Sequence, residues 1–252
     1  MKYYKIEING NEVWSVKNEN ILSVIEGDIF GQFNITETKV DIENVKICAP
    51  IINNYIIAVG ANYLAHIKES NSVREAPLDP VLFVKLPTSI IAHNESIILP
   101  KDVGRIDYEA EIAVMIGDDL CDADVTTAKN AVFGVTCLND VSARVIQQQD
   151  GQWIRAKNFR TFCPLGPCVE TEIDLDNIQV ELRQNGVVKQ SGNSNMMIFK
   201  IPELLSFISK HIPLRKGDII TTGTPEGVGP LQPGDEVEVD IKGVGILRNK
   251  VI

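Results

Sequence analysis

The stretch Asp107-Tyr108-Glu109-Ala110-Glu111-Ile112-Ala113-Val114-Met115-Ile116-Gly117 has the alternation of a β-strand and contains two glutamates. On a β-strand, side chains two residues apart share a face and lie about 6.6 to 6.8 Å apart along it. Glu109 and Glu111 therefore point to one side, and that side continues with Ala113 and Met115. The opposite side is apolar: Ala110, Ile112, Val114 and Ile116. We predict a strand that carries two carboxylates on a partly apolar face.

Two carboxylates on such a face repel each other unless a cation or a proton lies between them. A metal ion is one interpretation of Glu109 and Glu111. The other is a strand end that reaches into water, with both side chains solvated. The strand by itself does not decide between the two.

A third carboxylate follows a second apolar run, from residue 131 to residue 138, which ends in Asn139-Asp140. With Glu109 and Glu111, Asp140 would complete an all-oxygen site of the kind that suits Mg²⁺ or Mn²⁺, with positions left for water or substrate. Asp140 also precedes an expected helix, so it could instead be only a helix cap.

His66 and Glu69 are three residues apart, which makes them neighbours on one face if the segment is helical. The carboxylate could then orient the imidazole and raise its basicity, and such a pair can deprotonate water. A surface contact between the two side chains is the alternative. Residues 221–229, Thr-Thr-Gly-Thr-Pro-Glu-Gly-Val-Gly, form a Gly-rich loop without the Lys-Ser/Thr of a phosphate-binding loop. Its hydroxyl and N–H groups could hold a carboxylate.

Composition narrows the classes of function. The chain has 252 residues and a formal net charge of −10, with basic residues scattered singly. Such a surface repels nucleic-acid backbones and anionic membranes, so we expect neither as a partner. The five cysteines show no CxxC spacing, and the first residues lack the apolar core of a signal peptide. These features indicate a reduced, cytoplasmic protein.

Strand patterns dominate the chain, so we predict a mainly β fold of the α+β class with an antiparallel or mixed sheet. Asn9-Gly10 and Asn185-Gly186 predict two hairpins. Helices are expected after Asp124, from Ser142 to Gln149 and from Ile201 to His211. A Pro50 and Asn53-Asn54 boundary divides the chain into a small β-rich domain, 1–50, and a larger domain, 51–252.

The motifs occur in a specific order: Gly-x-Asn-Tyr-x-x-His-x-x-Glu, Asp-Tyr-Glu-x-Glu-Ile-Ala-Val-x-Ile-Gly, Asn-Asp-Val-Ser-Ala-Arg, Lys-Asn-Phe-x-Thr-Phe-x-Pro-Leu-Gly-Pro and Thr-Gly-Thr-Pro-x-Gly-Val-Gly. In this order they resemble the fumarylacetoacetate hydrolase family over roughly residues 55 to 252. Residues 1 to 50 resemble the small amino-terminal domain of some bacterial members. The resemblance implies a mixed β-sandwich roll and a homodimer.

By this resemblance, Glu109, Glu111 and Asp140 match the metal ligands, and His66 and Glu69 match a water-activating dyad on a lid segment. Lys157 matches a catalytic lysine beside the metal. Arg144 is expected to be a structural partner of the site. The expected substrate contacts are Gln147, Thr224 and Arg74.

The activity that the resemblance implies is hydrolysis of a carbon–carbon bond in a 1,3-dicarbonyl 2-oxo acid through a metal-stabilised enolate. Decarboxylation or tautomerisation of oxaloacetate, and isomerisation of 2-hydroxyhepta-2,4-diene-1,7-dioate, are alternatives at the same site, and a non-catalytic metal- or metabolite-binding protein is another. The expected cofactor is Mg²⁺ or Mn²⁺, with Ca²⁺ possible in vitro, and the expected partner is a small anionic 2-oxo acid or dicarbonyl. Val145 and Arg160 depart from the residues that relatives often carry, which puts substrate choice in doubt.

Overall fold

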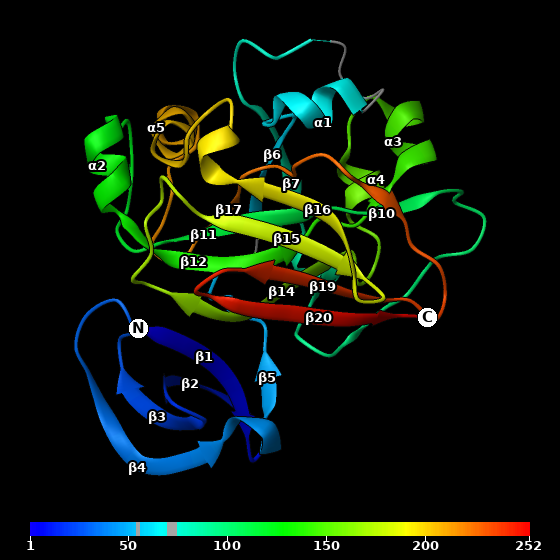
Figure 1. The fold of residues 1–252 in the computed structure, drawn as a ribbon. Coiled ribbons are helices and arrows are strands. Elements are labelled where there is room, and N and C mark those ends of the chain that lie inside the picture. Colours follow the sequence, from blue (N-terminus) through cyan, green and yellow to red (C-terminus); the bar gives the residue numbers. More distant parts are fainter. Residues whose placement is uncertain (54–55, 70–74) are drawn as a thin grey trace.

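A computed structural model of the chain describes residues 1–53, 56–69 and 75–252 (Figure 1). A twelve-stranded sheet forms its centre, in the order β4-β3-β2-β1-β14-β12-β11-β17-β6-β7, with β5 paired to β1 and β8 to β14. Its strands are β1 Lys2–Ile8, β2 Asn11–Asn18, β3 Ile21–Gly27, β4 Phe33–Asp41, β5 Lys46–Cys48, β6 Ile56–Gly60, β7 Val81–Lys85, β8 Ile90–Ile91, β11 Ala110–Ile116, β12 Val132–Asn139, β14 Cys163–Glu170 and β17 Ile219–Thr221.

Two smaller sheets complete the β structure. A five-stranded sheet, β16-β15-β19-β20-β9, packs over the large one, with β20 against β14, β19 against β12 and β15 against β11 (Figure 1). A three-stranded sheet has the order β13-β10-β18. The strands are β9 Ser96–Ile97, β10 Ile106–Tyr108, β13 Ser142–Ala143, β15 Gln179–Gln184, β16 Val187–Asn193, β18 Gly229–Pro230, β19 Glu236–Ile241 and β20 Gly245–Val251. The predicted mainly β fold is confirmed.

The core divides at strand β11 as its alternation predicts. The face of Ala110, Ile112, Val114 and Ile116 belongs to the cluster that fills the space under the five-stranded sheet, with Val180, Leu182, Val237, Val239 and Leu247. The opposite face, with Ala113 and Met115, packs in a second cluster with Ile56, Leu138, Leu165 and Ile219. Both faces of β11 are buried, which places the carboxylate-bearing segment inside the protein.

Helices are short and lie mainly at the end of the molecule away from the N-terminal strands (Figure 1). They are α1 Leu64–Glu69, α2 Val125–Asn130, α3 Arg144–Asp150, α4 Ile154–Lys157 and α5 Ile201–His211, with single turns at Ile42–Asn44, Pro87–Ser89 and Ser194–Met196. Asp124 caps α2 through the N–H of Thr127, as expected. The helix expected from Ser142 begins at Arg144, because Ser142 and Ala143 pair with Asp107 and Ile106 as a strand.

Both predicted hairpins form. Asn9 and Gly10 have φ of 52° and 79°, and Asn185 and Gly186 have φ of 52° and 76°. Two consecutive positive φ angles are typical of type I′ turns, whose twist matches that of the paired strands.

The N-terminal strands are continuous with the large sheet. Strand β1 pairs with β14 through Lys2 opposite Glu170 and Tyr3 opposite Val169. Their small cluster of Tyr3, Val16, Ile25 and Ile29 also packs against Phe133 of the larger part. Among the described residues, no helix is long and apolar enough to span a membrane.

Candidate metal centre and active site

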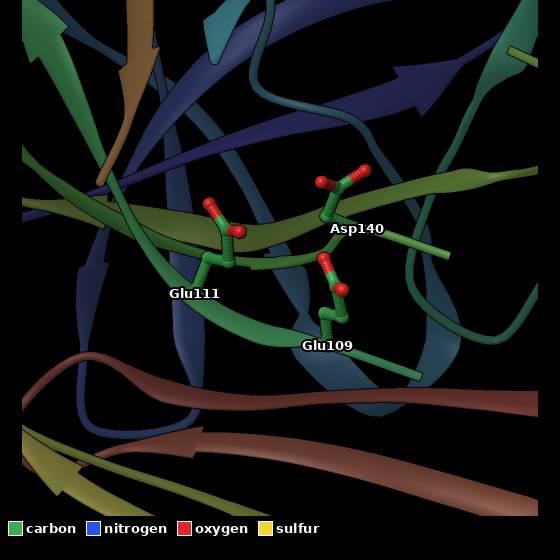
Figure 2. A group of neighbouring side chains, drawn as sticks. All are labelled: Glu109, Glu111 and Asp140. Carbon is green, nitrogen blue, oxygen red and sulfur yellow. The ribbon is translucent and has the colours of Figure 1, made fainter. Parts of the chain in front are cut away.

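Three carboxylates converge where β11 begins and β12 ends (Figure 2). The two strands are antiparallel and Ala110 lies opposite Asn139, so Glu109 and Asp140, one residue beyond each, lie side by side. The N–H of Glu109 donates to Asn139 Oδ1 at 2.9 Å, and the N–H of Asp140 donates to the Glu109 carbonyl at 2.8 Å. One oxygen from each of Glu109, Glu111 and Asp140 lies within 4.8 Å of the others.

These carboxylates are buried, with exposures of 3%, 2% and 0% for Glu109, Glu111 and Asp140. The two Glu side chains are therefore not solvated at a strand end. Asp140 does not cap α3 either, since the N-cap of that helix is Ala143 and no side chain caps it. Both sequence-based alternatives to a common site thus disagree with the structure.

Three cations contact the cluster. Lys157 Nζ lies 2.6 Å from Glu109 Oε2 and 2.6 Å from Asp140 Oδ2. Arg144 Nη2 lies 2.6 Å from Glu109 Oε1, and Lys85 Nζ lies 2.6 Å from Asp140 Oδ1. Burial alone would raise the pKa of Glu109, but Arg144 and Lys157 hold it well below its usual range. Glu109 is therefore ionised.

Glu111 lies in a different environment from Glu109. Its Oε2 accepts hydrogen bonds from the Thr221 hydroxyl and, at 3.0 Å, from the Gly223 N–H. Burial, followed by the negative charges of Asp140 and Glu109, raises the pKa of Glu111 well above its usual value. The Gly-rich loop thus holds a carboxylate, and that carboxylate is the protein's own. Among the described residues, no Lys or Arg side chain forms an ion pair with Glu111, unlike Glu109 and Asp140.

A cavity of about 20 Å³ adjoins the cluster, which is space for one ion or one water molecule. Seven predicted site residues line it: Glu109, Glu111, Asp140, His66, Lys157, Gln147 and Thr224. Glu69 is not among the lining residues, and Arg74 lies outside the described residues. The structure therefore brings together most of the residues that the sequence assigns to the site.

Aromatic side chains form one wall of the cavity. The rings of Phe83 and Trp153 pack edge to face with centroids 5.4 Å apart, and Lys157 Nζ lies 5.1 Å from the centroid of Phe83. Gly60 allows this packing, because a Cβ there would lie 2.2 Å from the Trp153 ring. Neither aromatic residue belongs to a motif used in the sequence analysis.

His66 and Glu69 lie on one face of α1, as their spacing predicts, but they are not hydrogen-bonded. His66 Nδ1 and Glu69 Oε2 are 3.7 Å apart, beyond hydrogen-bonding distance. Glu69 Oε2 instead accepts from the Gly227 N–H at 2.9 Å. Burial lowers the pKa of His66, which favours the neutral ring.

Arg144 connects the cluster to its surroundings. Its Nε donates to Asp107 Oδ2 at 2.8 Å and its Nη1 to Gln147 Oε1 at 2.9 Å. Asp107 also accepts from Arg105 at 2.6 Å. Arg144 itself lines the cavity, and its supporting role stays a prediction.

The two departures lie away from the cavity. Val145 and Arg160 are exposed, and neither lines the cavity. Val145 packs over Gly104 instead.

Two buried polar residues near the cluster were missed by sequence analysis. Lys85 stands at the end of an apolar strand, and a charged residue in that position is the only signal that could have drawn attention to it. Gln190 accepts from the Ala110 N–H at 2.9 Å and donates to Thr224 Oγ1 at 2.8 Å. It lies in a run of consecutive polar residues in β16, which gives no signal.

The residues present fit a divalent metal ion. Their donors are all carboxylate oxygens, which hard divalent cations prefer. The ammonium of Lys157 already lies between two of the three carboxylates, which shows that this position accepts a cation. Burial and the charges of Asp140 and Glu109 raise the pKa of Glu111 because no cation offsets them there, and a bound metal ion would favour its ionised form.

Comparison with known proteins identifies the family. The model of the fumarylacetoacetate (FAA) hydrolase C-terminal family matches residues 55–252. The chain belongs to the fumarylacetoacetate hydrolase family. The match begins after the N-terminal strands.

Similar proteins include members of the family with different named activities. A mitochondrial oxaloacetate tautomerase of Rattus norvegicus is 40% identical over 220 residues, 82% of this chain and 70% of its own length. A 2-hydroxyhepta-2,4-diene-1,7-dioate isomerase from Mycobacterium marinum is 34% identical, with a TM-score of 0.92 over 100% of this chain and 98% of its own. A fumarylacetoacetate hydrolase from Exiguobacterium antarcticum is 32% identical, with a TM-score of 0.88 over 100% and 99%. These relatives place the chain among enzymes.

Proposed function

We propose that this chain is a divalent-metal-dependent enzyme that interconverts the keto and enol forms of a small 2-oxo dicarboxylic acid, with oxaloacetate as the first candidate. The observation that carries the proposal is the buried Glu109, Glu111 and Asp140 cluster beside a neutral histidine. The 40% identity to an oxaloacetate tautomerase supports the choice of reaction.

Charge supports an anionic substrate. The carboxylates of Glu109, Glu111 and Asp140 are matched in number by Lys85, Arg144 and Lys157. Asp107 is matched by Arg105, which lies 2.6 Å from it. Once Glu111 is ionised, as a bound metal ion requires, this set of described residues is neutral, so a divalent ion would leave about two positive charges in a buried site, and a dianion would neutralise them.

We propose Mg²⁺ or Mn²⁺ as the cofactor, with Ca²⁺ able to replace it in vitro. Glu109, Glu111 and Asp140 would hold the ion, and three carboxylates that leave positions for water or substrate suit these cations. When bound, such an ion supplies Lewis acidity that favours negative charge on a neighbouring carbonyl oxygen.

Side chains of the pocket would move the proton. The neutral imidazole of His66 would take a proton from the carbon beside the keto group, and the same proton would return to the carbonyl oxygen as the enol forms. Lys157 adds a positive charge near the developing enolate oxygen. We further propose that Gln147, Thr224 and Arg74 contact the substrate.

Oxaloacetate tautomerisation can be followed by the ultraviolet absorbance of the enol form, with Mg²⁺ or Mn²⁺ and after chelation. We expect the rate to fall to the uncatalysed rate on chelation and in Glu111→Gln. Glu172→Gln, which changes an exposed carboxylate outside the site, serves as the matched control and should keep the full rate. A rate that survives both chelation and Glu111→Gln would refute the proposal.

Hydrolysis of a carbon–carbon bond in an acylpyruvate is the second candidate, favoured by the adjacent His66 and Glu69. It ranks second here because Glu69 bonds Gly227 and leaves His66 without the carboxylate contact that would orient a base toward water. Assaying acylpyruvate beside oxaloacetate separates the two reactions. Acylpyruvate cleavage that disappears in Glu69→Gln, together with no turnover of oxaloacetate by the unaltered protein, would make hydrolysis the function.

Two further readings belong to the same experiments. Oxaloacetate decarboxylation would release CO₂, which tautomerisation does not. A binding protein without activity would turn over neither substrate while Mg²⁺ still raised its melting temperature.

We also propose a cytoplasmic homodimer. Sedimentation equilibrium tests the dimer, and a monomer mass at micromolar concentration would refute it.

A further inference from the structure

Lys85 ends strand β7, and its side chain is entirely buried, with 0% exposed. Burying an ammonium group costs much free energy unless each of its N–H groups meets an acceptor. Lys85 Nζ donates to Asp140 Oδ1 at 2.6 Å, to the Phe162 carbonyl at 2.8 Å and to the Lys157 carbonyl. Because an ammonium has three N–H donors, its hydrogen-bonding capacity is fully used.

All three acceptors belong to the candidate metal centre or to the segments that support it. Asp140 is a proposed ligand, and the Lys157 carbonyl ends the helix that carries the second ammonium. The Phe162 carbonyl also accepts from the N–H of Val141, the residue after Asp140. Lys85 does not line the cavity, whereas Asp140 and Lys157 do. Lys85 therefore contacts the centre from behind.

The contact divides the two oxygens of Asp140 between different tasks. Oδ1 accepts from Lys85, and Oδ2 lies against the Lys157 ammonium that faces the cavity. The last torsion of an aspartate is broad, so the side chain's own rotamer preference does not fix the carboxylate plane. The bond from Lys85 supplies that missing constraint.

We infer that Lys85 is a positioning residue for the metal centre: it fixes the Asp140 carboxylate so that Oδ2 faces the cavity as a ligand. The inference rests on the proposed function, since it requires a divalent ion at Asp140. Partners of metal ligands commonly act in this way, and their loss weakens metal binding about 10- to 100-fold.

The direction of the effect separates positioning from simple electrostatics. Removing a positive charge from the neighbourhood of a cation site strengthens cation binding if charge is all that matters. Losing the orientation of a ligand weakens it. A residue that only fills space would leave the affinity of the folded protein unchanged.

The experiment measures Mn²⁺ binding without substrate, by electron paramagnetic resonance of free Mn²⁺, in the full-length chain. Lys85→Met removes every donor, and Lys85→Gln keeps an amide that can reach a backbone carbonyl but removes the charge that pairs with Asp140. Val237→Ala, in the core strand β19, controls for loss of stability alone. We expect the Mn²⁺ affinity to fall at least about 10-fold in both Lys85 variants and to stay unchanged in Val237→Ala.

Unchanged or tighter Mn²⁺ binding in the Lys85 variants, with normal binding by the unaltered protein, would overturn the positioning role and leave the proposed function intact. If the unaltered protein bound no Mn²⁺, both would be overturned. If Lys85→Met does not fold, Lys85→Gln decides the outcome, because its amide can still donate to a buried carbonyl of Phe162 or Lys157.

Discussion

Replacing Thr221 by Val tests whether Glu111 must be ionised to bind the metal. The two side chains have nearly the same shape, so the main loss is the hydroxyl that donates to Glu111 Oε2. Thr222 is an adjacent control, since it is equally buried and its hydroxyl donates to the backbone carbonyl of Ile112 at 2.9 Å. Both variants therefore lose one buried hydrogen bond, and only Thr221→Val loses one to a carboxylate.

The magnitude follows from the charge state of Glu111. Its raised pKa means that the metal-free protein favours the protonated form, whereas a bound metal ion requires the ionised form. A hydrogen bond contributes about 0.5–1.5 kcal/mol when neutral and about 1.5–3 kcal/mol when one partner is charged. The difference of about 1–1.5 kcal/mol corresponds to a loss of metal affinity of roughly 5- to 10-fold.

Isothermal calorimetry of Mn²⁺ binding to the two variants measures this difference. We expect Thr221→Val to bind roughly 5- to 10-fold more weakly and Thr222→Val to bind like the unaltered protein, while both melt at similar, lower temperatures. Equal Mn²⁺ affinity in the two variants would show that the Thr221 hydroxyl does not favour the ionised carboxylate, and the reasoning would be wrong.

Three further predictions concern the pH dependence of metal binding, Lys157 and Gly60. Because the pKa of Glu111 is raised, its contribution to stability in the metal-free protein is present at low pH and is lost as pH rises from its ordinary value of 4.5 through the raised one. Metal binding reverses this, so the Mn²⁺-induced rise in melting temperature should grow with pH over that window; thermal melts from pH 5 upward check it, and a constant rise would contradict it. Lys157→Met leaves Glu109 and Asp140 without their shared ammonium, so we expect a loss of about 3–5 kcal/mol in denaturant unfolding without metal, partly restored by Mn²⁺. Because this ammonium lies between two of the proposed ligands, we also expect its removal to enlarge the Mn²⁺ effect, and a smaller Mn²⁺ effect than in the unaltered protein would contradict this reasoning. Gly60→Ala forces a Cβ against the Trp153 ring, so we expect the free energy of unfolding to fall by about 1–3 kcal/mol and the tryptophan fluorescence to shift. An unshifted spectrum would show that the added methyl group does not displace Trp153.

Local patterns predicted the fold well where one period dominated. The alternation at Ala110–Ile116 correctly divided the two core clusters, and the two Asn-Gly pairs correctly placed hairpins. Ser142 and Ala143 were predicted to be helical, because local signals cannot show that a distant strand, Ile106–Tyr108, pairs with them.

The candidate site shows the same limit. The sequence order of the motifs pointed to most of the residues that line the cavity, but the local pattern around Asp140 could not tell whether it capped a helix or faced Glu109. That question is decided by the register of β11 against β12. Lys85 is 55 residues from Asp140 in the chain, and nothing in its local pattern indicates the ion pair. Likewise, the spacing of His66 and Glu69 predicts proximity, whereas the competing Gly227 N–H lies 158 residues from Glu69.

The pairing of β1 with β14 covers one edge of the larger part of the sheet. Strand β14, Cys163–Glu170, is buried along its whole length and is hydrogen-bonded to β12 on one side and to β1 on the other. Without the N-terminal strands, part of an apolar strand would become an open sheet edge, ready to pair with another chain. The N-terminal strands thus cover the β14 edge, and a form of the chain without them would need another segment to cover it.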